Sequence, residues 1–364
     1  MKSWDVIIVG AGVIGLSLGW RLRGDGLRVL VVDKGEPGRE ASYAAGGMIA
    51  HCDPNPASKL RALVRASAEI YRAFVREIED ESGESADLRE QGTLAFFLEH
   101  ENPGCEGARR LDANDVRALE PVIARDALSK DRNAYLLPEC SVDPRALCGT
   151  LVKAARHRGV DFVTGSAVIE VETQNGRAAG VRTAHSSYAA DIVVNCAGAW
   201  AAQIRPFGPP THAAKGQMVC VVPAPEDVAE GPVVQHVVRA PEVYIIPRSD
   251  RRVLLGATVE DAGFDKRTDA NTVETFYRAA ATIVPTIGSM RIHDAWAGLR
   301  PASPDNLPIL GETSLPGYFA ATGHYRDGIM LAPVTAKLMT QIIRREALSL
   351  SLDAFSPLRF QDNS

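Results

Sequence analysis

The first residues whose types and spacing could do chemistry form a glycine-rich run near the start of the chain. The run Gly10-Ala11-Gly12-Val13-Ile14-Gly15 follows an apolar, β-branched stretch at 5–9 and opens a helix predicted over 13–23. Glycines at this spacing permit a tight turn, close approach of a pyrophosphate to the backbone and close packing of the helix on the strand. The start of the helix adds free N–H groups and a positive dipole end. The run therefore predicts a dinucleotide site, and alone it does not distinguish NAD from FAD.

The segments that follow supply further groups for a dinucleotide. A second buried strand, predicted over 27–32, ends at Asp33, whose carboxylate can accept hydrogen bonds from a ribose hydroxyl. The segment 39–48 is then packed with small side chains, which permit close backbone approach to a bulky planar ligand. A tight helix contact or an open loop explains the same composition, so this segment favours a flavin without requiring one.

Three side chains later in the chain could bind a small acidic substrate. The planar guanidinium of Arg300 can hold a carboxylate by two parallel hydrogen bonds. Tyr244 lies on a predicted alternating strand, where its hydroxyl could reach the same group, and Arg326 lies in the glycine-flanked loop 323–328. Each has an ordinary alternative explanation, as an interface arginine, a half-buried core tyrosine or a surface ion pair.

The positions of these residues in space depend on the order of strands and helices along the chain. Ser58 and Asp143 are predicted helix N-caps, and Asn175-Gly176 is typical of a type I′ hairpin turn. Strands are predicted at 5–9, 27–32, 88–98, 296–301, 307–310 and 318–321 and within 163–194 and 219–255, and helices at 13–23, 58–81, 114–119, 144–158, 272–283 and 328–345.

This order predicts an α/β fold in which a Rossmann-type βαβ domain is interleaved with a β-rich, antiparallel-sheet domain. We expect both domains to be discontinuous, because the β-rich stretches interrupt the α/β ones. The dinucleotide-binding domain is assigned to 1–85, 143–210 and 295–364, and the substrate-binding domain to 86–142 and 211–294.

The composition excludes several classes of protein. The chain has 364 residues, 46% hydrophobic and 23% charged, which suits about two globular domains. A net charge of −5 argues against non-specific binding to nucleic acid or to an anionic membrane. No stretch approaches ~20 uninterrupted apolar residues, and glycines interrupt the apolar run at 6–20, so we expect neither a membrane span nor a signal peptide. The six cysteines include no Cys-x-x-Cys pair, which fits a reducing cytoplasm without a metal site.

Several further motifs occur along the chain in a characteristic order and spacing. They are Asn195-Cys196-Ala197-Gly198-Ala199-Trp200, Lys215-Gly216-Gln217, Tyr244-Ile245-Ile246-Pro247-Arg248, Gly256-Ala257-Thr258, Trp296-Ala297-Gly298-Leu299-Arg300-Pro301 and Gly323-His324-Tyr325-Arg326-Asp327-Gly328-Ile329. Together with the N-terminal motifs, they make the chain resemble glycine oxidase, within the wider D-amino-acid oxidase and sarcosine oxidase superfamily of flavoproteins. The resemblance covers nearly the whole chain.

The resemblance implies a flavoenzyme that oxidises a small amine. Arg300 and Tyr244 would anchor the substrate carboxylate, Arg326 would lie near the flavin and the mouth of the site, and Val259 and Met48 would line the substrate pocket. A hydride would pass from the substrate to FAD, hydrolysis of the imine would give glyoxylate or another 2-oxo acid, and oxygen would yield hydrogen peroxide. The implied cofactor contacts are Gly10, Gly12, Val13, Ile14, Gly15, Asp33, Lys34, Ser42, Ala45, Gly46, Gly47, Met48, Val168, Ala197, Gly198, Trp200, Gly298, Arg300, His324, Tyr325, Arg326, Asp327, Gly328 and Ile329.

Two residues invite a catalytic role that we do not assign. His324 is expected to contact the cofactor, because hydride transfer from a neutral amine needs no strong base. Lys215 is expected to be a strand-edge residue rather than a cation that activates oxygen.

Two features bear on the substrate and the cofactor. Characterised glycine oxidases can carry methionine where this chain has Val259, so the preferred amine stays open. The loop 323–328 lacks the cysteine with which monomeric sarcosine oxidases tether their flavin, so we expect non-covalent FAD.

Other functions remain possible from the sequence. They are a D-amino-acid dehydrogenase that uses an acceptor other than oxygen, a secondary-amine oxidase acting on an N-substituted glycine, the flavin module of an RNA-modifying enzyme that removes a carboxymethylamino group, and a non-catalytic flavin subunit. The acidic balance disfavours the RNA enzyme. We expect the partners to be a small amine or amino acid and oxygen, with no nucleic acid and no membrane, and a homo-oligomer, such as a tetramer.

Overall fold

The glycine-rich run lies at the carboxyl end of a buried parallel strand. The computed structural model describes residues 4–53, 59–98, 100–125, 127, 132–206, 208–224 and 231–360. Strand β1 (Trp4–Val9), helix α1 (Val13–Gly24) and strand β2 (Val29–Val32) form the predicted βαβ unit. The run thus forms the turn that carries the chain from β1 into α1.

The first sheet is built around these two strands. Its order is β17-β18-β11-β1-β2-β8, and the strands from β18 to β8 are parallel, whereas β17 pairs antiparallel with β18. A meander of β9, β10 and β11 extends it, with Asn175 and Gly176 both at positive φ in the turn. The remaining strands are β8 (Asp161–Val163), β9 (Val168–Gln174), β10 (Arg177–Thr183), β11 (Ser187–Asn195), β17 (Ile309–Glu312) and β18 (Tyr318–Thr322).

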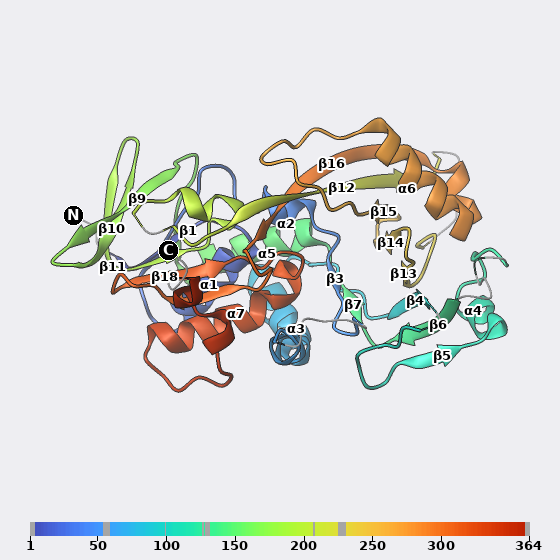
Figure 1. Cartoon of the computed structure of the whole chain (residues 1–364), viewed down its shortest axis with the longest axis horizontal. Helices are drawn as coiled ribbons and strands as arrows, with labels where there is room; N and C mark the ends of the chain where they lie inside the picture. The colour runs from blue at the N-terminus through green and yellow to red at the C-terminus, as the bar shows by residue number, and fades with distance from the viewer. Residues whose placement is uncertain are drawn as a thin grey trace.

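Helices pack beside this sheet in the left-hand lobe of Figure 1. Helix α1 contacts α5 (Pro144–Arg158) and α7 (Gly328–Ile343), and both also contact α3 (Arg61–Ser82). Asp143 caps α5, because its carboxylate accepts a hydrogen bond from the N–H of Arg145 at 2.8 Å. The predicted cap Ser58 lies outside the described residues, and α3 begins after Leu60 without a side-chain cap.

The second sheet forms the other lobe, with α6 (Ala270–Ile283) packed on β12 and β15. Its order is β16-β12-β15-β14-β13-β4-β6-β5. All neighbours are antiparallel except β13 and β4, which run parallel. The strands are β4 (Thr93–Leu98), β5 (Arg109–Leu111), β6 (Arg132–Leu137), β12 (His212–Val222), β13 (Val237–Arg239), β14 (Tyr244–Pro247), β15 (Val253–Gly256) and β16 (Arg291–Ala302).

Two strand predictions had the wrong length. The strand expected over 88–98 starts only at Thr93, although Arg89 makes an isolated bridge to Ser141. The strand expected over 296–301 extends over 291–302, because its exposed first residues, which are mostly polar and show no clear alternation, also pair with β12. The proposed domain boundary at 295 falls inside this strand, and the division into two discontinuous domains stays a proposal.

Small elements join the lobes. Helix α2 (Ala41–Ala44) is followed by β3 (Met48–Ile49), which pairs with β7 (Cys140–Ser141), and the 3₁₀ helix Gly198–Gln203 follows β11. Helix α4 (Ala113–Leu119) has a capping box between Asp112 and Asp115.

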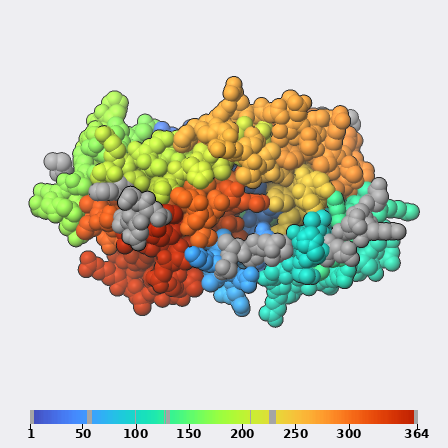
Figure 2. Space-filling view, in the orientation of Figure 1, coloured from blue at the N-terminus to red at the C-terminus, as the bar shows by residue number. Residues whose placement is uncertain are grey.

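In Figure 2, atoms of the blue N-terminal part are visible in a hollow between the red and the yellow-orange parts of the molecule. No helix in the described ranges is both long and apolar enough to cross a lipid bilayer.

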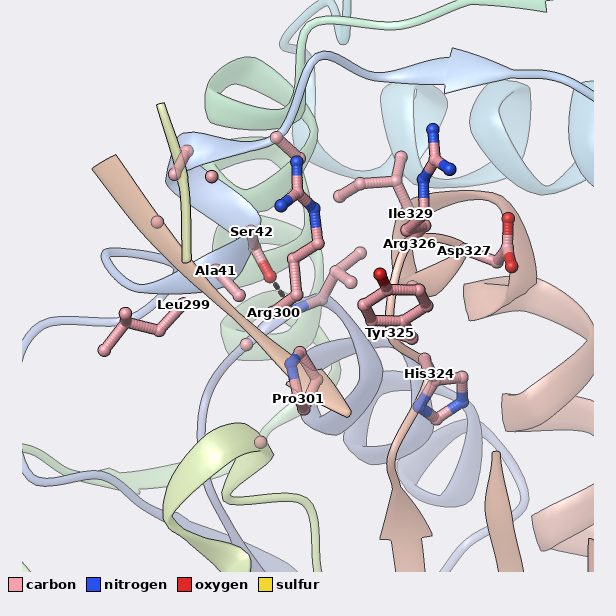
Figure 3. A pocket seen from close by; sticks show the side chains of 18 of the residues that line it. Ala41, Ser42, Leu299, Arg300, Pro301, His324, Tyr325, Arg326, Asp327 and Ile329 are labelled. Atoms are coloured by element: carbon pink, nitrogen blue, oxygen red, sulfur yellow. Dashed lines mark hydrogen bonds between the residues drawn. The ribbon is translucent and has the colours of Figure 1, made fainter. Parts of the chain in front are cut away.

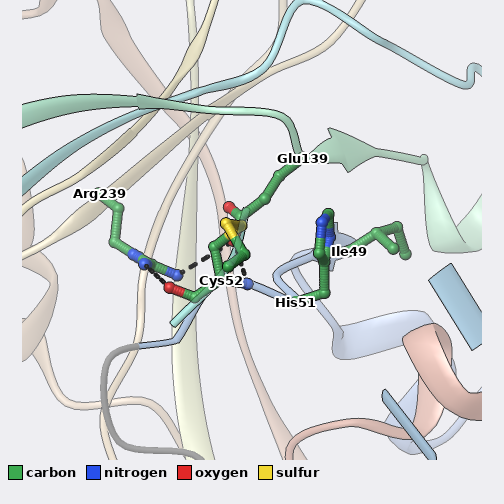
Figure 4. Close-up of a disulfide and its surroundings, with 6 residues drawn as sticks. Ile49, His51, Cys52, Glu139 and Arg239 are labelled. Atoms are coloured by element: carbon green, nitrogen blue, oxygen red, sulfur yellow. Dashed lines mark hydrogen bonds and ion pairs between the residues drawn. A yellow bond between two sulfur atoms is a disulfide. The ribbon is translucent and has the colours of Figure 1, made fainter. Parts of the chain in front are cut away.

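A disulfide corrects the expectation that the cysteines are all reduced. Cys52 and Cys105 are bonded, with their Cα atoms 4.8 Å apart, although 53 positions separate them in the chain (Figure 4). His51 lies beside them as a possible third metal ligand, but both sulfur atoms are bonded to each other. The bond joins the segment after β3 to the loop after β4, a contact that no spacing rule predicted.

Candidate active site

A cavity of about 730 Å³ is lined by residues of both sheets. The turn after β1, the segment 40–51, the 3₁₀ helix 198–203, strands β12, β14 and β16, and the loop 323–329 all reach it. Gly15 is the only predicted site residue that does not line it. Those that do are Gly10, Gly12, Val13, Ile14, Asp33, Lys34, Ser42, Ala45, Gly46, Gly47, Met48, Val168, Ala197, Gly198, Trp200, Tyr244, Val259, Gly298, Arg300, His324, Tyr325, Arg326, Asp327, Gly328 and Ile329.

The three glycines of the turn have different surroundings. Gly10 has φ +105°, and a Cβ there would collide with the Cys196 carbonyl; a Cβ on Gly15 would collide with the Gly10 carbonyl. Gly12 has an extended backbone with φ −73°, and its Cβ would have only Ser42 Oγ nearby, at 3.4 Å. Gly10 and Gly15 are therefore required by the chain itself, whereas Gly12 leaves open space on the cavity side.

The start of α1 fits a pyrophosphate. The N–H of Val13 donates to Ser42 Oγ at 3.0 Å, while those of Gly12 and Ile14 have no acceptor among the described residues. Asp33 is fixed by the N–H groups of Ala11 at 2.6 Å and Gly35 at 2.8 Å. Free N–H groups at a helix N-terminus suit an anion, so the residues present fit a dinucleotide phosphate.

The small-residue segment is held against the second sheet. The fully buried Arg248 follows β14 and donates from Nη2 to the Gly46 carbonyl at 2.6 Å. A Cβ on Gly46 would collide with the side chain of Ile246, which lies on β14. Burial lowers the pKa of Arg248 to about 10, and the nearby Asp143 opposes this. We did not predict this role for Arg248, although it ends one of the motifs that carry the family resemblance and directly follows an apolar strand.

Two predicted cofactor residues meet at the edge of the cavity. The Lys34 ammonium lies 3.1 Å from the centroid of the Trp200 ring and pairs with Glu40 at 3.2 Å. A cation over an aromatic face is attracted by the ring quadrupole. This contact joins the end of β2 to the 3₁₀ helix, two segments far apart in the sequence.

Arg300 lies on β16 opposite Ala214 of β12. Its Nη1 donates to the carbonyls of Thr258 at 2.9 Å and Lys215 at 3.2 Å. A Cβ on Gly216 would overlap the guanidinium, so this glycine makes room for it. Glycine within a strand often marks such a close approach, and that signal could have identified Gly216 from the sequence.

A second guanidinium lies near the first. Arg326 donates from Nη2 to the Tyr244 hydroxyl at 3.0 Å, which leaves the hydroxyl hydrogen free to donate. In Figure 3, the side chains of Arg300, Tyr325 and Arg326 lie close to one another. Tyr325 has φ +48°, and its N–H donates to the Pro301 carbonyl at 2.8 Å, which ties the loop to β16. Burial, and then the positive charge of Arg326, lowers the pKa of Arg300. An anion bound between the two cations would relieve their repulsion.

His324 and Asp327 point away from Arg300 (Figure 3). His324 is 2% exposed, with Nε2 3.0 Å from Thr335 Oγ1, and burial lowers its pKa to about 3. Burial raises the pKa of Asp327 to about 6, although Arg326 opposes this. The imidazole is therefore neutral at neutral pH, and its low pKa makes it a poor proton acceptor.

A dinucleotide cradle beside the first sheet and a cavity with two arginines beside the second fit a dinucleotide-dependent enzyme of two interleaved domains that acts on a small anion. The model of the family described as DAO, FAD dependent oxidoreductase, matches residues 5–342, and the chain belongs to this family. The predicted FAD cofactor is thereby confirmed.

Individual relatives agree with this assignment. The chain is 32% identical over 98% of its length to the bifunctional protein ThiO/ThiG of Trichormus variabilis, and it spans 55% of that longer protein. It is 31% identical to the glycine oxidase of Pseudomonas aeruginosa, over 94% of this chain and 95% of that one. The crystal structure of glycine oxidase from Geobacillus kaustophilus has a TM-score of 0.88 at 30% identity and covers 99% of each chain. The predicted α/β fold with a second sheet domain is confirmed.

Proposed function

We propose that the protein oxidises glycine, a small N-substituted glycine or a small D-amino acid. The observation that carries this proposal is the convergence of Arg300, Arg326 and the Tyr244 hydroxyl on the cavity that also contains the dinucleotide cradle. Two cations and a hydroxyl donor around one space select a small anion, and the carboxylate of an amino acid matches them.

The proposed binding follows from hydrogen-bond geometry. Arg300 uses Nη1 for two backbone carbonyls, and its Nη2 and Nε have no hydrogen bond to any described residue. These two groups can donate in parallel to the two oxygens of a carboxylate. Tyr244 can donate its free hydrogen to the same group. Such anchoring fixes the α-carbon relative to the cofactor, and orientation is the main contribution that the protein makes.

The chemistry that bound FAD supplies is acceptance of a hydride from the α-carbon and transfer of both electrons to oxygen, which gives hydrogen peroxide. Hydrolysis of the imine product then gives a 2-oxo acid and an amine or ammonia. No side chain is assigned as a base. The histidine of the loop, His324, is hydrogen-bonded to Thr335 and has a pKa of about 3. The substrate amine must therefore react in its neutral form.

Val259 supports a pocket that accepts more than glycine. Its short side chain lines the cavity and is 56% exposed. Met48 lines another part of the same cavity, at the start of β3. The space beside Val259 leaves room for an N-alkyl group or a small D-side chain, which is why these substrates stay within the proposal.

An aerobic substrate panel with peroxide detection tests this function. It should include glycine, sarcosine, N-ethylglycine, D-alanine, D-proline and longer N-alkyl glycines. We expect peroxide in proportion to substrate consumed for at least one of them. Turnover only with an artificial acceptor would point to a dehydrogenase, and no turnover of any amino acid would contradict the proposal.

We also propose that the protein is cytoplasmic, forms a homo-oligomer and uses neither nucleic acid nor a membrane as a partner. The net charge of −5 disfavours nucleic acid and anionic membranes as partners. The resemblance to glycine oxidase supports the cytoplasm and the homo-oligomer, whereas the Cys52–Cys105 disulfide counts against a reducing compartment. Gel filtration with light scattering tests the oligomeric state.

A further inference from the structure

The guanidinium of Arg300 is oriented by two carbonyls that lie on different segments. One is the carbonyl of Lys215 on β12, and the other is that of Thr258, just after β15. A guanidinium held at one nitrogen by two fixed acceptors can rotate little about its stem. The direction of its free donors therefore depends on how the segment 257–260 sits on β12.

That segment is attached to β12 at one backbone bridge and several side-chain contacts. Lys215 and Glu260 exchange N–H···O bonds of 2.9 Å in both directions, and Lys215 Nζ lies 3.3 Å from Glu260 Oε2. Gln217 donates from its N–H to Thr258 Oγ1 at 2.9 Å and from Nε2 to Glu260 Oε1 at 2.8 Å. The Thr258 hydroxyl also donates to Glu260 Oε1.

The two β12 residues that make these contacts, Lys215 and Gln217, are buried, so losing a partner would leave a polar group unpaired away from water. Lys215 is 6% exposed and Gln217 is 2% exposed, and the ammonium of Lys215 has no other carboxylate within ion-pair distance among the described residues. Burial alone would raise the pKa of Glu260, but hydrogen bonds from Thr258, Gln217 and Lys215 outweigh burial and lower the pKa. A buried ammonium whose partner is removed is strongly destabilised, so it moves or draws in water.

We propose that the Lys215–Glu260 ion pair positions Arg300 for carboxylate binding, by fixing the two carbonyls that hold its Nη1. The inference rests on the proposed role of Arg300 as the carboxylate anchor. Neither Lys215 nor Glu260 needs to touch the substrate. Lys215 does not line the cavity, whereas Ala257 and Val259 of the held segment do. This also replaces the expectation that Lys215 is a simple strand-edge residue.

The test uses the FAD-loaded enzyme and acetate as a probe of carboxylate affinity. Lys215→Met and Glu260→Gln should each raise the dissociation constant of acetate, measured by calorimetry, and the KM for the best amino-acid substrate of the panel by about 10-fold or more, since small displacements of a positioning group can cost up to about 100-fold. The kcat at saturation and the bound FAD should change much less. Lys215→Arg, which keeps the charge, should restore most of the affinity.

A double-mutant cycle separates positioning from a general effect on stability. In an Arg300→Ala background, Lys215→Met should change acetate affinity by less than about 2-fold, because its effect passes through Arg300. An equal effect in both backgrounds would overturn the inference, as would a lower melting temperature with unchanged acetate affinity. Lys153→Met and Glu84→Gln are matched controls, because that exposed pair at 2.8 Å lies outside the cavity lining.

The same cycle distinguishes this inference from the proposed function. If Arg300→Ala leaves acetate affinity unchanged, the carboxylate anchor itself is wrong and the positioning role falls with it. If Arg300→Ala weakens acetate but the Lys215 and Glu260 variants do not, only the positioning role is wrong.

Discussion

Arg300 carries the most specific prediction at the scale of single residues. Arg300→Ala should reduce kcat/KM for amino-acid substrates by about 30-fold or more, since losing a charge-assisted contact to a buried carboxylate costs roughly 2–5 kcal/mol. FAD content should be unchanged. Arg300→Lys should recover only part of the lost kcat/KM, because an ammonium cannot hold two backbone carbonyls and a carboxylate in one plane.

The measurement compares a substrate with a carboxylate to a small amine without one, in both variants and the unmodified enzyme. The simple amine should be nearly insensitive to the change, because it never used the anchor. Equal sensitivity of both substrates would remove Arg300 from the carboxylate site.

His324 gives a pH prediction at the same scale. Its folded-state pKa of about 3 lies below the ordinary value of 6.5, so its contribution to stability is present above pH 6.5 and is lost as the pH falls. At pH 5 this loss is about 2 kcal/mol. Asp327, whose pKa is raised to about 6, acts in the opposite direction, because the folded state then holds its proton more tightly.

The contribution of His324 is isolated by comparing the protein with His324→Asn in urea unfolding at pH 8 and pH 5. The difference in unfolding free energy between the two proteins should shift by about 2 kcal/mol in favour of the variant at pH 5. The exposed His212 provides the matched control for replacing a histidine by asparagine. A pH-independent difference for His324→Asn would contradict the neutral, buried imidazole.

At the scale of elements, the turn between β1 and α1 separates glycines that the fold needs from one that the ligand needs. Gly12→Val should leave the chain folded, because Gly12 has an ordinary extended backbone and only Ser42 near its Cβ position. The same side chain should abolish FAD binding by occupying the space for the pyrophosphate. The measurement is flavin absorbance per chain, with circular dichroism as the check on folding.

Gly15→Ala is the informative comparison for that turn. A Cβ there would collide with the Gly10 carbonyl, so this variant should lower the melting temperature even without FAD. A Gly12→Val protein that folds and retains normal flavin would show that the dinucleotide is not bound at this turn.

At the scale of the whole molecule, the cofactor should lie between the two lobes without a covalent bond. The purified protein should be yellow, and acid precipitation should release free FAD into the supernatant. The loop 323–328 has no cysteine, and the cavity-lining Cys196 is buried, which raises the pKa of its thiol and disfavours the reactive thiolate. Flavin that stays with the precipitated chain would refute non-covalent binding.

The sequence by itself determined the features encoded within a few adjacent residues. The glycine turn, the Asp143 cap of α5 and the Asn175-Gly176 turn were predictable, because the conformation of each depends on its own backbone and side chain. The family resemblance placed nearly all of the predicted residues on one cavity, with only Gly15 outside it.

Only the tertiary structure decided the contacts between distant segments. It brings Arg248 to Gly46, Lys215 to Glu260 and Cys52 to Cys105, and it pairs β13 parallel to β4. These contacts join segments up to 202 positions apart, as for Arg248 and Gly46. Local propensity and periodicity carry no information about such partners, because a buried ion pair or a strand pairing is set by which surfaces pack together. The orientation of Arg300, on which the proposed chemistry depends, belongs to this second group.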